Sequence, residues 1–308
     1  MTVFLTGSTG FVGGYILREL LRQGHTVRGL VRNKADAMPD RVEQVSGSVT
    51  SPDTLHGVMD GCDAVIHLVG IIQEHPARGV TFDAIHVGGT KAVVDEARKA
   101  GISRFIQMSA NGARRDGVSA YQTSKWHAEE YVRQAGFAHW TIFRPSLIFG
   151  DPGPGGFEFA SELARTLVRP LPVLPVFGNG RFEMQPVSVE EIAAAFVQAL
   201  TLDAAHGKIY YAGGQERITF LELLDRITDA IGHARKLKIP NPSVLVRPVI
   251  RFLDGTGILP VSLDQFDMLM EGNTCDSTAF YQDFDLAFKP FSPENLSYLK
   301  RRGKSGSA

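Results

Sequence analysis

Residues 3–13 have the sequence Val-Phe-Leu-Thr-Gly-Ser-Thr-Gly-Phe-Val-Gly, a short apolar run that enters a Gly-x-x-Gly-x-x-Gly turn. The stretch from Tyr15 to Leu21 follows with helical apolar spacing. Gly7 permits a tight turn, Gly10 lets the backbone approach a pyrophosphate, and Gly13 allows close packing of the helix on the strand. Because a helix N-terminus attracts phosphate, this order of elements predicts a dinucleotide site at the first turn.

The end of the next predicted strand, residues 26–32, bears on which dinucleotide binds. It falls about 20 residues past the glycines, where an NAD site places an acidic residue on the ribose. Here Arg32 is followed by Asn33 and Lys34, so this position offers no carboxylate. A guanidinium can pair with a 2′-phosphate through two hydrogen bonds. The sequence therefore favours NADP(H) over NAD(H); the alternative is that Arg32 is a solvated arginine at a strand end.

The bulk properties narrow the class of protein. The chain has 308 residues and a net charge of −1, so we expect no nucleic-acid partner. Its two cysteines, Cys62 and Cys275, lack metal-ligand or Cys-x-x-Cys spacing, and the core needs neither a disulfide nor a metal. The chain starts directly in the first predicted strand, and no apolar run reaches a membrane-spanning length. We expect a cytoplasmic protein without signal peptide or transmembrane segment.

Strand-like and helix-like segments alternate as far as Gly150. This alternation predicts an α/β fold, a Rossmann-like doubly wound parallel sheet with helices on both faces. We expect residues 1–150 to form the dinucleotide-binding domain. Further strands are predicted over residues 41–49, 63–70, 104–109 and 140–145, and helices over residues 52–60, 82–100 and 119–134.

The composition changes after Gly150. Residues 151–308 predict a smaller C-terminal cap, or substrate region, interleaved with the last sheet elements. A loop rich in Gly and Pro comes first, and prolines then interrupt helix over residues 170–175. A strand at 208–212 and a helix at 220–231 follow. Residues 244–253 predict a helix with an apolar face and arginines, which suits a wall of the substrate cleft or an interfacial or docking helix near Arg235, Lys236 and Lys238.

Tyr121 and Lys125 form a Tyr-x-x-x-Lys pattern on the helix predicted over residues 119–134. Residues four apart share one helix face, so the phenol and the ammonium point to one cleft. A nearby cation lowers the pKa of a phenol, and we expect this to make Tyr121 a usable acid or base beside a nicotinamide. The alternative is an exposed tyrosine and lysine on an amphipathic helix.

Together these motifs resemble the extended or atypical branch of the short-chain dehydrogenase/reductase superfamily, which includes NAD-dependent epimerases and dehydratases. The glycine turn, Tyr121 with Lys125, and residues 144–150 (Arg-Pro-Ser-Leu-Ile-Phe-Gly) carry the likeness over nearly the whole chain. Three further segments, residues 85–90, 108–110 and 185–189, are similar to the 39-kDa accessory subunit of respiratory complex I and its bacterial relatives. The resemblance to the mitochondrial member of that group implies that NADPH is bound structurally rather than turned over. It also implies a partner in a membrane complex and a location peripheral to the membrane.

The resemblance also implies a role for individual residues. Tyr121, Lys125 and Ser109 would be catalytic, with Lys125 also on the nicotinamide ribose. Arg32 would meet the 2′-phosphate. The remaining cofactor-binding residues would be Gly7, Ser8, Thr9, Gly10, Phe11, Val12 and Gly13 at the pyrophosphate, Leu68, Val69 and Gly70 at the adenosine ribose and diphosphate, and Pro145, Ser146 and Ile148 at the carboxamide.

Three departures from the family pattern bear on catalysis. Active members carry a second hydroxyl residue where this chain has Ala110 after Ser109, and Ser109 would have to substitute for it. Ser48 replaces the aspartate that meets adenine, and His86 stands where extended members often have asparagine. We interpret His86 as a packed helix histidine rather than a catalyst.

Two functional hypotheses follow. The first is an NADP-dependent reductase or epimerase that acts on the carbonyl or carbinol of a small molecule. The second is a structural or sensor protein that binds NADPH. Ala110 weakens the first hypothesis, and the intact Tyr121 and Lys125 weaken the second. No residue identifies the substrate; Arg181 and the loop 177–180 could hold an acidic head group or be solvated.

Overall fold

A parallel sheet organises the chain. The structure, a computed structural model, describes residues 1–33, 38–153, 156–241 and 263–301. Within these residues the sheet has seven strands in the order β11-β6-β5-β4-β1-β2-β3, and all neighbouring strands are parallel. The predicted doubly wound α/β fold is therefore confirmed. The strands are β1 (Thr2–Thr6), β2 (Thr26–Val31), β3 (Val42–Ser46), β4 (Ala64–His67), β5 (Arg104–Met108), β6 (His139–Pro145) and β11 (Lys208–Ala212).

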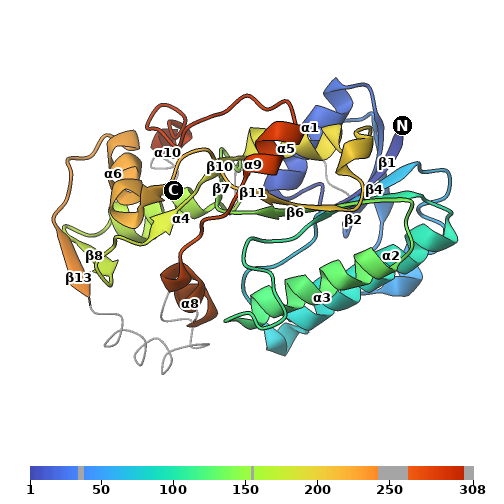
Figure 1. The fold of residues 1–308 in the computed structure, drawn as a ribbon, viewed down its shortest axis with the longest axis horizontal. Helices are drawn as coiled ribbons and strands as arrows, with labels where there is room; N and C mark the ends of the chain where they lie inside the picture. Colours follow the sequence, from blue (N-terminus) through green and yellow to red (C-terminus); the bar gives the residue numbers. More distant parts are fainter. Residues whose placement is uncertain (34–37, 154–155, 242–262, 302–308) are drawn as a thin grey trace. The chain divides into compact units, whose positions relative to one another are not determined.

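Helices cover both faces of this sheet. On one face lie α2 (Gly89–Lys99) and α3 (Ala120–Gln134), and on the other lie α1 (Phe11–Arg22) and α5 (Val189–Gln198) (Figure 1). All four residues of β4 are buried, as expected of a strand that is covered on both sides. The strand order reverses between β1 and β4, so the carboxyl ends of these two strands flank the crevice where such sheets bind ligands.

Two predicted helices differ from the structure. The helix predicted over residues 52–60 is wrong beyond its first turn, because only η1 (Pro52–Leu55), a 3-10 turn, forms. Gly57 then turns the chain with a φ of 71°, and its N–H donates to the carboxylate of Glu96 at 2.9 Å instead of continuing a helix. The helix predicted over residues 82–100 is two segments, the π-helical turn η3 (Asp83–Gly88) and α2.

The chain divides into two compact units. The first comprises residues 1–145, 190–212 and 277–286, and the second comprises residues 146–189, 213–276 and 287–308. The first unit therefore takes in β11 and α9 (Thr278–Asp283) from later in the chain. It also contains η2 (Pro76–Arg78) and η5 (Asp203–Ala205).

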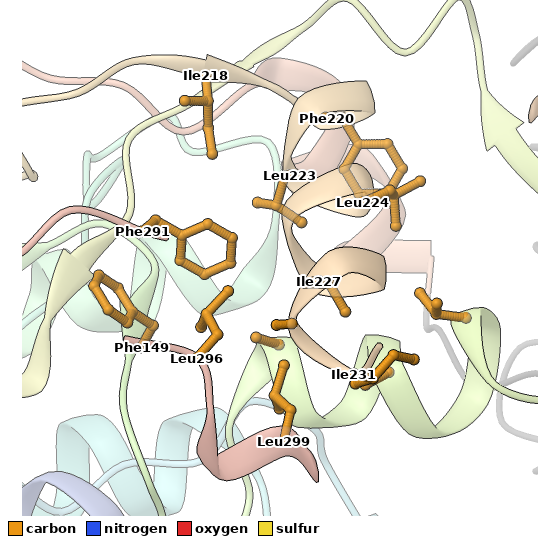
Figure 2. Packing of buried hydrophobic residues seen from close by; sticks show 14 of the residues in the cluster. Phe149, Ile218, Phe220, Leu223, Leu224, Ile227, Ile231, Phe291, Leu296 and Leu299 are labelled. Atoms are coloured by element: carbon orange, nitrogen blue, oxygen red, sulfur yellow. The ribbon is translucent and has the colours of Figure 1, made fainter. Parts of the chain in front are cut away.

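The core of the second unit forms around α6 (Phe220–Ala230). Phe220, Leu223 and Ile227 lie on its buried face, and Phe149 and Phe291 belong to the same cluster (Figure 2). Thr219 and Glu222 cap this helix reciprocally, which accounts for its start. The other elements of the unit are β7 (Ile148–Phe149), α4 (Phe159–Leu163), η4 (Ala164–Val168), β8 (Leu174–Phe177), β9 (Glu183–Met184), β10 (Val187–Ser188), β12 (Ile218–Thr219), β13 (Lys238–Asn241), α8 (Leu263–Glu271) and α10 (Tyr298–Arg301).

The helix predicted over residues 244–253 lies outside the described residues. The three cations that we associated with it all have local partners. Arg235 pairs with Asp229 at 2.9 Å, Lys236 donates to the carbonyl of Leu171 at 2.7 Å, and Lys238 pairs with Asp225 at 2.5 Å. Across the described ranges, no helix has both the length and the apolar character needed to cross a bilayer.

Candidate functional site: a dinucleotide cradle beside Tyr121 and Lys125

The glycine turn lies between β1 and α1. Gly7 has a φ of 75°, which side chains rarely allow, and a Cβ on Gly13 would lie 2.0 Å from the carbonyl oxygen of Gly7. The helix begins after Gly10, and no side chain caps it there. Its first N–H groups, together with the positive end of the helix dipole, form a site for an anion. The turn therefore fits the pyrophosphate that we predicted for it.

The predicted cofactor segments of the first unit meet in one continuous strip. A Cβ on Gly7 would lie 3.3 Å from the Cβ of Leu68, so the glycine turn packs against the segment after β4. A Cβ on Gly70 would lie 2.9 Å from the Nζ of Lys125, so the same segment reaches α3. Lys125 in turn donates to the carbonyl oxygen of Met108, the last residue of β5, at 3.3 Å. The glycine turn, the segment after β4, the end of β5 and Lys125 of α3 thus lie together at the carboxyl ends of the parallel strands.

The protonation of Tyr121 differs from our expectation. Burial raises the pKa of the Tyr121 phenol to about 12, whereas we predicted that Lys125 would lower it. Burial also lowers the pKa of Lys125 to about 8, and the charge of Glu129 offsets part of that change. The prediction is wrong, because burial removes water from around the phenol and disfavours its charged form. Tyr121 is a neutral phenol here.

Ser109 follows β5 and is buried. Its N–H donates to the carbonyl of Phe143 at 2.7 Å, and its hydroxyl has no hydrogen-bond partner among the described residues. Ala110 beside it is 8% exposed, so a hydroxyl at this position would also need a partner. The segment after β5 therefore carries one hydroxyl without a hydrogen-bond partner among the described residues and one buried methyl group.

The remaining predicted residues lie farther along the chain. Arg32 follows β2 and is exposed. Pro145 ends β6, and its carbonyl accepts the N–H of Asn111 at 2.9 Å, which ties the loop after β5 to β6. Ser146 and Ile148 belong to the second unit, where the Ser146 hydroxyl donates to the carbonyl of Gln185. Pro145 therefore belongs to the first unit, whereas Ser146 and Ile148 belong to the second.

His86 connects the segment after β4 to helix α3. Its Nε2 lies 3.0 Å from the amide nitrogen and 3.1 Å from the carbonyl oxygen of Ile71, and its Nδ1 is hydrogen-bonded to the hydroxyl of Ser124 at 2.8 Å. Ser124 in turn donates to the carbonyl of Tyr121 at 2.9 Å. The His86 ring also packs edge-on against the Tyr121 ring, with 5.4 Å between centroids.

His86 is a buried, neutral histidine. Burial lowers its pKa to about 2, and the charge of Lys125 acts in the same direction. This agrees with our interpretation of a packed histidine. The sequence offered one signal for its contact with α3, since Ser124 lies inside the Tyr-x-x-x-Lys pattern, but the partner 38 residues away could not be deduced from spacing.

The comparison with protein families decides the classification. A family model described as NAD(P)H-binding matches residues 7–202, which include the glycine turn, Tyr121 and Lys125. The chain belongs to the NAD(P)H-binding family. Within this family, the NAD(P)H-binding protein belongs with the extended short-chain dehydrogenase/reductase-like proteins, as its motifs indicated.

The names of two relatives of this NAD(P)H-binding protein describe different roles. A mitochondrial NADH dehydrogenase [ubiquinone] 1 alpha subcomplex subunit 9 of Arabidopsis thaliana is 30% identical over 99% of this chain and 78% of the relative. A ceramide reductase of Caulobacter vibrioides is 31% identical over 79% of this chain and 75% of the relative. One relative is thus a named complex subunit, and the other is a named reductase.

A solved structure supports the fold. The UDP-glucose 4-epimerase of Thermotoga maritima, crystallised with UDP-glucose, has a TM-score of 0.75 and 16% identity to this chain. The match covers 98% of this chain and 99% of the epimerase. At this identity the likeness shows a shared fold alone.

Proposed function

We propose that this NAD(P)H-binding protein is an NADP(H)-dependent oxidoreductase that acts on a carbonyl or carbinol, with Tyr121 as the acid or base. The observation that carries the proposal is the unbroken strip from the glycine turn through Leu68 and Gly70 to Lys125. A protein that only held phosphate would not need a lysine and a tyrosine at the far end of that strip. The reductase among the relatives supports the same reading.

Each residue of the strip has a separate task in this proposal. The bound nicotinamide supplies or accepts a hydride. Tyr121 is protonated across the neutral range because its pKa is about 12, so it can donate its proton to a carbonyl oxygen during reduction. Lys125 holds the nicotinamide ribose and stabilises the phenolate that donation leaves behind. Ser109, the unpartnered hydroxyl, would orient the carbonyl in place of the residue that Ala110 lacks.

We assign the preference for NADP(H) to Arg32. Arg32 follows β2 and is exposed to solvent. β2 pairs with β1, the strand that ends at the glycine turn. Neither Arg32 nor Asn33 offers a carboxylate for the ribose hydroxyls. A bidentate pair with a 2′-phosphate is the contact that these residue types can make.

A second candidate is a structural or sensor protein that keeps NADPH bound without turnover. Ala110 favours it, because this position lacks the hydroxyl that active members of the resembled family carry. The complex subunit among the relatives supports a partner in a membrane-bound complex and a peripheral location.

One experiment distinguishes the two candidates. The protein is purified, its absorbance is scanned for reduced nicotinamide, and a panel of aldehydes and ketones is added to the NADPH-loaded protein. Carbonyl-dependent loss of the absorbance, abolished in Tyr121→Phe, is expected for the oxidoreductase. Retention of bound NADPH with every carbonyl, equal in the protein and in Tyr121→Phe, would instead establish the structural candidate.

A further inference from the structure

Two aliphatic side chains are exposed in the segments that follow β4 and β5. Ile72 is 42% exposed and Val118 is 48% exposed. Ile72 follows β4, and Val118 follows β5, its direct neighbour in the sheet. Among the described residues of the first unit, the exposed large aliphatic side chains are these two and that of the terminal Met1.

The backbone of both loops is linked by hydrogen bonds to α3, directly or through His86. The N–H of Val118 donates to the side-chain oxygen of Gln122 at 2.8 Å. The N–H of Ile71, the residue before Ile72, is hydrogen-bonded to the His86 ring, and the His86 ring is hydrogen-bonded to the hydroxyl of Ser124. Gln122 follows Tyr121 by one residue and Ser124 by three, so at about 100° per residue they lie on opposite sides of Tyr121 around the helix axis. The two loops that carry Ile72 and Val118 are therefore linked to α3 on both sides of Tyr121.

Close packing keeps these loops in place. A Cβ on Gly117 would lie 2.7 Å from the Cβ of Gln122, and a Cβ on Gly112 would lie 2.5 Å from its Nε2. A Cβ on Gly70 would lie 2.9 Å from the Nζ of Lys125. The loops therefore approach α3 as closely as glycine permits, and the exposure of the two aliphatic side chains belongs to a well-packed arrangement.

We infer that the ligand of this site is a ketone or secondary alcohol carried on an aliphatic chain, with that chain lying against Ile72 and Val118. The inference rests on the proposed function. In the reduction, the ketone carbon gains a hydride from the reduced nicotinamide and its oxygen gains the Tyr121 proton, which gives the secondary alcohol and oxidised nicotinamide. Exposed aliphatic surface beside a reacting group is stabilised when an apolar chain displaces its water.

The same loop offers a competing chemistry. Arg115 lies three residues before Val118 and is exposed, so a phosphate-bearing ligand could be held there instead. UDP-glucose is therefore the polar probe against which aliphatic ligands are compared. The aliphatic assignment is favoured because two side chains on two separate loops contribute to it, whereas the cation stands on one loop.

The test measures binding separately from turnover. NADPH-loaded protein, which cannot oxidise an alcohol, is titrated with 2-butanol, 2-hexanol and 2-octanol by calorimetry, and UDP-glucose is titrated alongside. We expect the dissociation constant to fall about fourfold for each added methylene, the factor for burying a CH₂ group. The double variant Ile72→Ser/Val118→Ser should lose at least half of this chain-length dependence. Leu237→Ser, a change at an aliphatic side chain of the second unit that is 69% exposed, is the matched control and should retain it.

The outcomes separate the inference from the function on which it rests. Tighter binding of longer alkanols that the double variant loses supports the aliphatic site, even if NADPH reduces none of the corresponding 2-alkanones; in that case the proposed function fails and the site assignment stands. Affinity independent of chain length, or an unchanged chain-length dependence in the double variant, overturns the inference. Tight UDP-glucose binding that Arg115→Ala abolishes also overturns it, while leaving an oxidoreductase function intact.

Discussion

Lys125 donates to the carbonyl oxygen of Met108 at 3.3 Å, so the side chain at the end of the Tyr-x-x-x-Lys pattern is directed to the end of β5. This contact joins α3 to the strand that leads into Ser109. It gives the ammonium a partner in a buried position, where an unpaired charge would be costly.

Replacing Tyr121 with phenylalanine deletes one hydroxyl and keeps the ring. If the protein is an oxidoreductase, turnover should fall by about 10²–10⁴-fold, the usual contribution of a general acid, and NADPH affinity should change little. Steady-state kinetics and a cofactor titration measure the two effects. Ala110→Ser is the reciprocal variant and should raise carbonyl reduction by restoring the missing hydroxyl. Full activity in Tyr121→Phe would remove Tyr121 from the mechanism.

Arg32→Ala should weaken NADPH binding about tenfold or more, because it deletes a charge-assisted phosphate contact, and should leave NADH binding nearly unchanged. Calorimetric titration with both cofactors measures the difference. Arg98→Ala changes an exposed arginine on α2 and serves as the control for loss of general positive charge. An equal loss for both cofactors, or a native preference for NADH, contradicts the assignment.

Gly13→Ala should abolish cofactor binding, since the new Cβ would lie 2.0 Å from the carbonyl oxygen of Gly7 and must displace the turn itself. Gly14→Ala is a close control, because its nearest neighbour would be an Arg18 side-chain nitrogen at 3.7 Å. Circular dichroism checks that both variants fold, and NADPH titration measures binding. Normal binding by a folded Gly13→Ala protein would show that the pyrophosphate lies elsewhere.

Glu158 predicts a pH dependence of stability in the second unit. Burial raises the pKa of this carboxyl to about 7 from its ordinary value of 4.5, although two backbone N–H groups at the start of α4 donate to it. The folded state therefore binds a proton more tightly than the unfolded state, and the contribution of Glu158 to stability falls as pH rises from about 4.5 to about 7.

Glu158→Gln cannot ionise and should remove this dependence. At about 1.36 kcal/mol per pKa unit, the stability difference between the protein and the variant should change by about 3 kcal/mol across that range. Urea denaturation at several pH values between 4 and 8 measures it. A difference that stays constant with pH would show that the carboxyl keeps its ordinary pKa in the folded state.

The sequence alone determined the fold class and the cofactor class. The glycine turn, the alternation of apolar strands with amphipathic helices, and the spacing of Tyr121 and Lys125 are local patterns, and local patterns follow from backbone sterics and helix periodicity. For the same reason the helix ends beside glycines were predicted well, as at the end of α3, where Gly136 has a φ of 78°.

The tertiary structure decided what those local patterns could not. Whether Gly70 lies against Lys125, and whether His86 reaches Ser124, depends on contacts between segments far apart in the chain. The pKa of Tyr121 depends on how much water remains around it, and the lysine four residues away reveals nothing about that. The residues at the site were therefore predictable one by one, whereas their protonation and their connection to one another came from the packing of the whole unit.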